Sequence, residues 1–288
     1  MKKVWMGWIA ILFLTLACGL SAPEPAPQTG VETIVAETLQ SITASAVPMT
    51  EAPTVSEGSV VSANSVKFSI PVGLGTSANV ETVAAVNIEE GPTFGQTPAH
   101  TKFSLTGYPL QGKFFEAYIL VYPTAEYELV NEGAAYNLQK LRAILASPSA
   151  PLTKDMLPGI TSFNAGMVFT SNMQVISFQN GTGVRFLTQY AQYLAVANNS
   201  DLFYEFQGLT HDGKYYIIAI LPVNVPFFAA DSSFPQTSLP ADGIPVIGDM
   251  PDEAYYTAVV DRLNQTAPEI FTPSILSLDV LIQSILAQ

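Results

Sequence analysis

Five polar residues near the middle of the chain have side chains that could recognise a small ligand: Arg185, Gln189, Glu205, Gln207 and Tyr216. We expect Gln189 to lie opposite Glu205 on a neighbouring antiparallel strand, so that the numbers of paired residues sum to about 394. This register places the first four residues on one sheet face. Gln207 would lie opposite Tyr216 on that face. A cation, a carboxylate, two amides and a phenol beside apolar walls are typical of a small-ligand site. The alternative is a polar network under a helix, or a solvent-facing stripe.

Patterns typical of catalysis are weaker. A hydrolase would need two carboxylates in one cleft with separated pKa values, and Glu116 and Glu205 are candidates that no spacing supports. There is no GxSxG motif, and the one cysteine, Cys18, lies near the N-terminus. The glycine turn GLGTSA (73–78) fits a dinucleotide-binding loop only loosely, and the pattern after it is antiparallel. We expect an ordinary glycine loop and no cofactor.

No metal site is predicted either. The two histidines, His100 and His211, are far apart in sequence and belong to no paired spacing. Four acidic residues cluster before a helical pattern, but the alternating spacing of an EF-hand loop is missing. They are Asp242, Asp249, Asp252 and Glu253. We expect Asp249 and Asp252 to serve the N-terminus of that helix.

Alternating and apolar segments predict the elements that must position these residues. Strands are expected at 66–71, 80–88, 101–108 and 114–122. Two hairpins follow between Met173 and Leu221, with turns at Asn180-Gly181 and Asp212-Gly213. The segment YYIIAIL is apolar on both faces, so helices should cover both sides of the sheet.

Helices are predicted over 131–146 and 251–265, and a last helix is expected to begin with Thr272 as its N-cap. Strands followed by terminal helices predict the α+β class: an antiparallel sheet of two or more hairpins flanked by helices, two of them C-terminal. The segment FSIPVG (68–73) and the final helices loosely resemble PsbP/Mog1-like domains. This resemblance implies a sheet between helical layers and identifies no functional residue.

The pattern of the N-terminus predicts an export signal. Lys2 and Lys3 precede an apolar run from Val4 to Leu16, which is too short for a permanent membrane span. The run LTLAC (14–18) resembles the lipobox of bacterial lipoproteins, with Thr15 where leucine is commoner. That resemblance implies cleavage before Cys18 and a lipid on its thiol. Otherwise Cys18 is incidental to an ordinary signal peptide.

The predicted organisation is a signal peptide (1–17), a lipidated cysteine with a flexible tether (18–62) and one α+β domain (63–288). An apolar island at 31–42 within the tether is either a marginal helix or a partner-binding one. Without residues 1–17 the chain has nine basic and 24 acidic residues, a net charge of −15. Such a charge disfavours nucleic acid as a partner.

The expected partners are the membrane, through the lipid on Cys18, and an envelope protein or a small polar ligand. The sequence favours an extracytoplasmic lipoprotein that acts as a binding or accessory module. The alternative is an extracytoplasmic hydrolase that uses carboxylates. A surface adhesin is disfavoured because the chain has no repeats.

Overall fold

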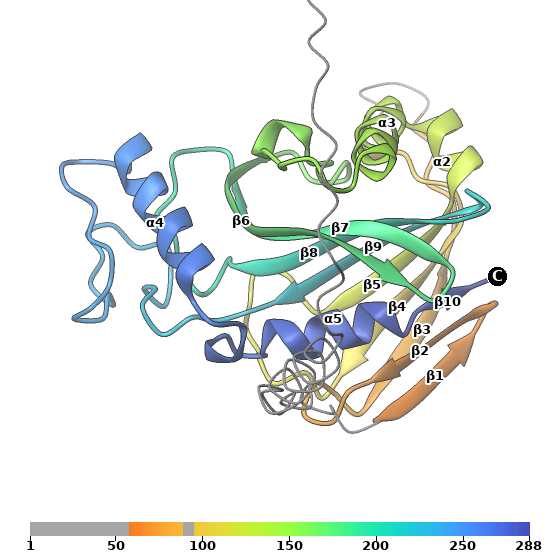
Figure 1. Ribbon diagram of the computed structural model, residues 1–288, viewed down its shortest axis with the longest axis horizontal. Helices are drawn as coiled ribbons and strands as arrows, with labels where there is room; N and C mark the ends of the chain where they lie inside the picture. Colours follow the sequence, from red (N-terminus) through yellow and green to blue (C-terminus); the bar gives the residue numbers. More distant parts are fainter. Residues whose placement is uncertain (1–57, 89–94) are drawn as a thin grey trace, which may run out of the picture. The chain divides into compact units, whose positions relative to one another are not determined.

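A seven-stranded antiparallel sheet forms the centre of the folded body (Figure 1). The computed structural model describes residues 58–88 and 95–288, which belong to the unit Thr54–Gln288. In spatial order, the strands are β3 (Ser77–Val83), β4 (His100–Thr106), β5 (Tyr118–Pro123), β9 (Tyr215–Pro222), β8 (Phe203–Thr210), β7 (Gly181–Ala191) and β6 (Gly166–Phe178). The edge strands of this sheet are therefore β3 and β6.

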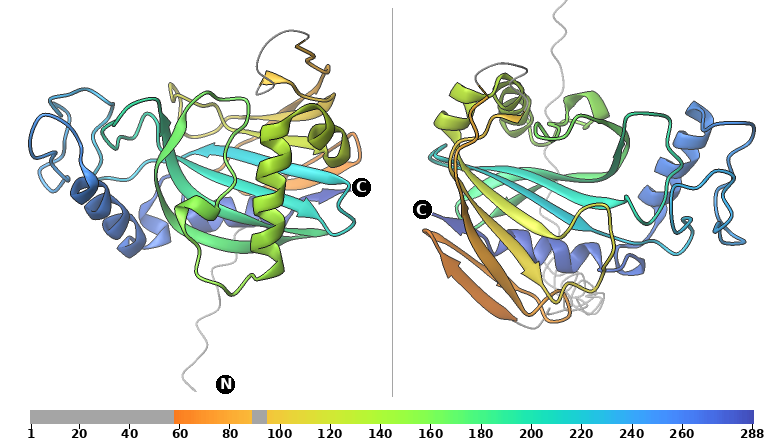
Figure 2. Two further views of the ribbon diagram at one scale, coloured as in Figure 1. Left: turned by 90° about the horizontal axis from the view of Figure 1, so that it is seen from above. Right: turned by 180° about the vertical axis from the view of Figure 1, so that it is seen from behind.

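Helices cover both faces of the sheet, as the apolar β9 segment predicts (Figures 1 and 2). Every residue of β8 is buried, which requires a packed layer on each side. One face packs against α2 (Thr124–Val130) and α3 (Glu132–Ala146). The other packs against α4 (Glu253–Gln265) and α5 (Ile275–Gln283). The predicted α+β class, with hairpins, flanking helices and two C-terminal helices, is confirmed.

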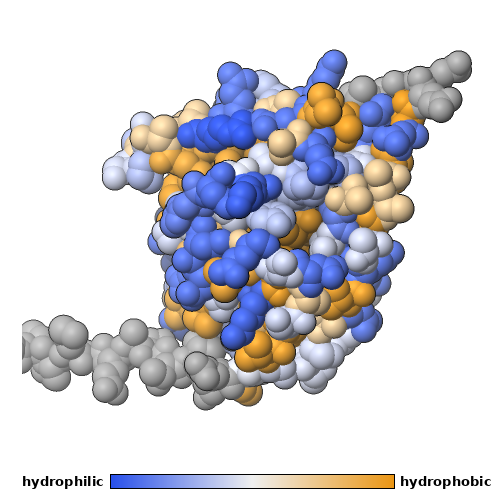
Figure 3. Space-filling model, turned by 90° about the vertical axis from the view of Figure 1, so that its right-hand side faces the viewer, coloured by the Kyte–Doolittle hydropathy of each residue, from blue (hydrophilic) through white to orange (hydrophobic). Residues whose placement is uncertain are grey.

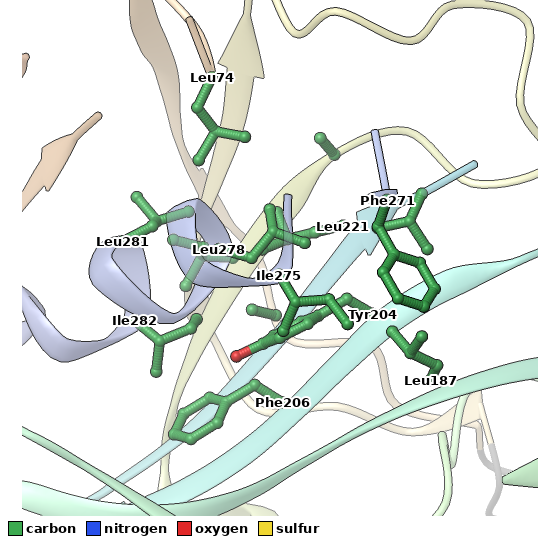
Figure 4. Close-up of a cluster of buried hydrophobic side chains, with 14 of the residues drawn as sticks. Leu74, Leu187, Tyr204, Phe206, Leu221, Phe271, Ile275, Leu278, Leu281 and Ile282 are labelled. Carbon is green, nitrogen blue, oxygen red and sulfur yellow. The ribbon is translucent and has the colours of Figure 1, made fainter. Parts of the chain in front are cut away.

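The core beneath α5 is the larger of the two apolar layers (Figure 4). Helix α5 carries Leu278, Leu281 and Ile282 at helical spacing, and all three are fully buried. They lie over Tyr204 and Phe206 of β8. The short 3-10 helix η3 (Pro268–Ile270) leads into this layer. Another, η2 (Lys154–Met156), lies in the connection between α3 and β6.

The helix caps agree with the sequence in part. Asp252 is the N-cap of α4, as expected, and accepts a hydrogen bond from the Tyr255 amide at 2.8 Å. The N-cap of α5 is Ser274, so the prediction of Thr272 is wrong. The backbone of Thr272 is engaged elsewhere, because it exchanges two hydrogen bonds with Asn224. Ser274 accepts from the Ser277 amide at 3.2 Å instead.

A smaller three-stranded sheet joins the two ends of the described chain. Its strand order is β1 (Ser59–Ala63), β2 (Val66–Ile70) and β10 (Leu286–Ala287). Strand β1 lies mostly within 18–62, so the expected tether boundary is four residues too late. The hairpin turns through Asn64 and Ser65, whose φ angles are +49° and +62°. This hairpin was not predicted from the sequence, because its turn is Asn-Ser and not the usual Asn-Gly.

Candidate functional site

The five candidate ligand residues lie on opposite faces of the sheet. Glu205 pairs with Phe186 and Gln207 pairs with Val184. The predicted register with Gln189 opposite Glu205 is therefore wrong by three residues. An odd shift moves every side chain of a strand to the other face. Glu205, Gln207 and Tyr216 face α3, whereas Arg185 and Gln189 face the side of α4 and α5.

A pair of glycines explains the observed register. Gly183 lies opposite Gly208, and the Phe206 ring covers both positions. A Cβ atom at Gly183 would lie 2.5 Å from the Phe206 ring, and one at Gly208 would lie 2.6 Å from it. Only glycine fits there. The sequence did not reveal this pairing because the connection between β7 and β8 is long and sets no register by its length. The first hairpin turn is similarly displaced by one residue, to Gln179–Asn180.

On the α3 face, Gln207 is the centre of a buried hydrogen-bond network. Its amide nitrogen donates to Glu205 Oε1 at 2.5 Å and to the Gly159 carbonyl at 3.2 Å. Its amide oxygen accepts from the Tyr216 hydroxyl. Asn137 of α3 clamps the same segment, because its side chain bonds both backbone groups of Gly159. The network thus fastens the segment before β6 to the sheet and to α3.

Glu205 contributes the carboxyl group of this network. Desolvation in the core raises its pKa to about 8, against hydrogen bonds that lower it. The Tyr190 phenol lies near the carboxyl, yet Glu205 Oε2 has no partner in hydrogen-bond geometry. At neutral pH the group is therefore protonated and uncharged. Such a group avoids the cost of a buried carboxylate.

On the opposite face, Arg185 and Gln189 hold other parts of the fold together. The Arg185 guanidinium pairs with Asp279 of α5 at 3.3 Å and donates to Gln174 at 2.6 Å. Tyr204 donates to the same Asp279 carboxylate at 2.8 Å. Gln189 bonds the backbone of residues 196 and 198, in the connection between β7 and β8. All five candidate residues are buried, and each has partners within the protein.

An open groove lies instead between α4 and the edge strand β6. It has a volume of about 660 Å³. A cavity of about 410 Å³ adjoins it and shares Lys154, Val168, Leu194 and Tyr256 with it. The floor of the groove is mainly apolar, formed by Val168, Phe169, Met173, Leu194, Tyr256 and Val260. Leu194 is 55% exposed, Phe169 is 2% exposed and the other four residues are half-buried, so the floor is partly open to solvent.

The rim of the groove is acidic on the α4 side. Asp252, Glu253 and Asp261 line it, and none of them takes part in a described ion pair. Arg262, the basic residue of α4, forms an ion pair with Asp242 at 2.6 Å, and its guanidinium stacks on the Phe227 ring. The groove's one cation is Lys154, which donates to the Val168 carbonyl at 3.0 Å. Burial lowers the pKa of this lysine.

Sequence reasoning missed this groove, although part of its signal was present. Tyr256 and Val260 are four residues apart on α4, beside the buried stripe of Tyr255, Val259 and Leu263. A helix with a second apolar pair beside its buried stripe has more apolar surface than it can bury against the core of its own domain. The partner surface on β6 was not predictable, because the predicted strand began at Met173 and β6 begins at Gly166.

Another cavity, of about 420 Å³, lies between the end of β4 and the 107–117 connection. Its polar lining includes Ser104, Gln111 and Glu116. Lys113 also lines it, and its ammonium donates to Asn224 Oδ1 at 2.6 Å. Glu205 does not line this cavity, so Glu116 and Glu205 do not share a cleft.

The remaining candidates form no common site. Gly73 has a φ of +84°, as expected of a glycine turn. Burial lowers the pKa of His100, which bonds the Pro98 carbonyl, while His211 lies in the turn before β9. Within residues 58–88 and 95–288, no cluster of acidic, His or Cys side chains could hold a metal ion.

In the same ranges no helix is long and apolar enough to cross a membrane. Cys18 and the 31–42 island lie outside the described residues. No family model, curated protein or solved structure matches the chain.

Proposed function

We propose that the chain is an extracytoplasmic lipoprotein whose folded domain binds an apolar segment of a partner in the α4–β6 groove. The observation that carries this proposal is the groove itself: an apolar floor, partly open to solvent, in a volume of about 660 Å³. Exposed apolar surface is costly in water, and a rimmed apolar groove is typical of a docking site.

The alternative function, a carboxylate hydrolase, has less support. Its candidate pair, Glu116 and Glu205, lies in two separate environments. Glu116 lines the cavity beside β4, while Glu205 is fully buried under the 157–161 segment. Acid–base catalysis needs both groups within reach of one substrate. A binding module requires no such pair.

The membrane anchor is the second part of the proposal. Diacylglycerol and a further acyl chain on Cys18 would hold the chain at a membrane without a spanning helix, since each buried methylene contributes about 0.8 kcal/mol. The acidic body would not bind anionic lipid by charge, so the lipid on Cys18 has to provide the attachment.

Cys18→Ser should abolish incorporation of labelled palmitate and move the chain from the detergent phase to the aqueous phase. Palmitate labelling that persists in Cys18→Ser would remove the anchor from the proposal.

Two neighbouring residues of α4 allow a matched test of the groove. Thr257 lines it, whereas Ala258 is exposed on the same helix and does not. We expect Thr257→Trp to fill the groove and Ala258→Trp to leave it open. The probe is N-phenyl-1-naphthylamine, an uncharged apolar dye, titrated into the full chain. Thr257→Trp should weaken saturable dye binding about tenfold, and Ala258→Trp should not. Equal binding by both variants, with unchanged melting temperatures, would refute the groove as the site.

A further inference from the structure

We propose that the α4–β6 groove recognises a basic amphipathic helix of another protein. This inference rests on the proposed function and specifies the chemistry of the partner. It requires the partner to present an apolar face to the floor and Lys or Arg side chains to the α4 rim. Its three supports are the chemistry of the β6 edge, the length of the groove and its one-sided charge.

The edge of β6 beside the groove is already occupied, which disfavours an added strand. Peptides that extend a sheet need free backbone groups along its edge. Here the Val168 carbonyl accepts from Lys154 at 3.0 Å, and the Asn172 amide donates to Asn264 of α4 at 2.7 Å. Two side chains thus block the stretch that a strand would have to pair with. A helix needs no such groups, because its backbone bonds are internal.

The groove follows α4 over at least two turns. Glu253, Thr257 and Asp261 recur every four residues along one side of the helix, and all three line the groove. The helix has 13 residues, so it is about 20 Å long. A partner helix of similar length can lie against this surface and place residues at i, i+3, i+4 and i+7 on the apolar floor.

The charge along the two walls is unequal. The α4 wall carries Asp252, Glu253 and Asp261. The β6 side of the groove, formed by Val168, Phe169, Thr170 and Met173, carries no charge, and neither does Leu194. Lys154 lines both the groove and the adjoining cavity, and its ammonium donates a hydrogen bond to the Val168 carbonyl. Basic side chains along one flank of the partner would therefore meet unpaired carboxylates, which favours selective association.

The side of the domain opposite α4 has a mixed surface. Figure 3 shows hydrophilic side chains interspersed with small hydrophobic areas there. Scattered apolar residues of this kind are normal on a protein surface.

The test uses three labelled synthetic peptides of 14 residues with the same leucine face. Their polar faces carry Lys, Gln or Glu, and their dissociation constants for the full chain are measured by fluorescence anisotropy at low salt. We expect the Lys peptide to bind about three- to tenfold more tightly than the Gln peptide, because several exposed ion pairs add modestly. The Glu peptide should bind most weakly. Higher salt should reduce the difference.

A matched pair of double variants locates the effect. Glu253→Gln/Asp261→Asn removes two charges from the rim, and Glu126→Gln/Glu132→Gln removes two exposed charges from α2 and α3 on the opposite face. Only the rim variant should reduce binding of the Lys peptide to the level of the Gln peptide. An equal loss in both variants would mean that overall charge attracts the peptide, and would overturn the inference.

The outcomes also separate this inference from the proposed function. If all three peptides bind equally and Thr257→Trp weakens each of them, the groove is a docking site but the charge preference is wrong. If Thr257→Trp leaves every peptide and the dye unaffected, the proposed function fails as well.

Discussion

Glu205 shows how a single buried carboxyl can make stability depend on pH. Its pKa is about 8 in the folded chain because burial disfavours the charged form. In the unfolded chain the same group ionises near its ordinary value of 4.5. Between these two values the folded chain holds a proton that the unfolded chain has released. Stability from this group is therefore fully present below pH 4.5 and is lost as pH rises toward 8.

Glu205→Gln should remove this dependence. Glutamine retains an oxygen that can accept from the Gln207 amide and has no proton to lose. We expect the slope of unfolding free energy against pH to become less negative by about 1.4 kcal/mol per pH unit between pH 5 and 8. Urea unfolding at four pH values measures this slope. The exposed residue Glu116 provides the control, because Glu116→Gln should retain the slope of the parent. An unchanged slope in Glu205→Gln would contradict the neutral buried acid.

At the scale of elements, most of the strands and helices were predictable, but β1, β10 and α2 were not, and neither was the register of β7 against β8. The apolar YYIIAIL segment of β9 correctly predicts two covered faces, because side chains alternate along a strand. The register of β7 against β8 depends on contacts remote in sequence, such as the Phe206 ring over Gly183 and Gly208. The candidate cluster was lost for this reason. The predicted pairing of Gln207 with Tyr216 is also wrong, by two residues, because Gln207 lies opposite Ile218 and Tyr216 lies opposite Leu209. Gln207 and Tyr216 nevertheless share a face, because an even shift keeps side chains on the same side of the sheet.

The same limit applies to helix ends. Thr272 and Ser274 are both good N-cap residues, so local sequence cannot choose between them. In the structure the backbone of Thr272 pairs with that of Asn224, and the helix begins two residues later, behind Ser274. The groove is a still more remote feature, since its two walls come from residues about 90 positions apart on β6 and α4.

The α5 cap can be tested directly. Ser274→Ala should lower the unfolding free energy by about 1 kcal/mol, because the Ser277 amide loses its acceptor. Thr272→Ala is the matched control at the alternative position and should have a much smaller effect, since its side chain is exposed. Chemical unfolding of both variants measures the difference. A larger loss in Thr272→Ala would place the cap at the residue that the sequence favoured.

At the scale of the whole domain, the last residues close the fold around its first strands. Leu286 and Ala287 of β10 pair with Lys67 and Val66 of β2. Just before them, the Ser284 hydroxyl bonds both backbone groups of Ser69, at 2.9 and 3.2 Å. The β1–β2 hairpin is thus fastened to the end of α5. A two-stranded hairpin is marginal by itself, so its order should depend on this attachment.

Deleting residues 286–288 should therefore loosen the hairpin and spare the larger sheet. The deletion removes the third strand, the buried Ala287 and the bond between the Gln288 amide and the Ser65 carbonyl. We expect amide exchange within 59–70 to accelerate at least tenfold, while β7, β8 and β9 keep their protection, because local opening needs less free energy than global unfolding. Gln288→Ala keeps the backbone of β10 and should exchange like the parent. If the deletion left 59–70 fully protected, contacts with α5 and β3 alone would be sufficient to hold the hairpin. If β7 to β9 also lost protection, the three-stranded sheet would be part of one cooperative unit with the rest of the domain.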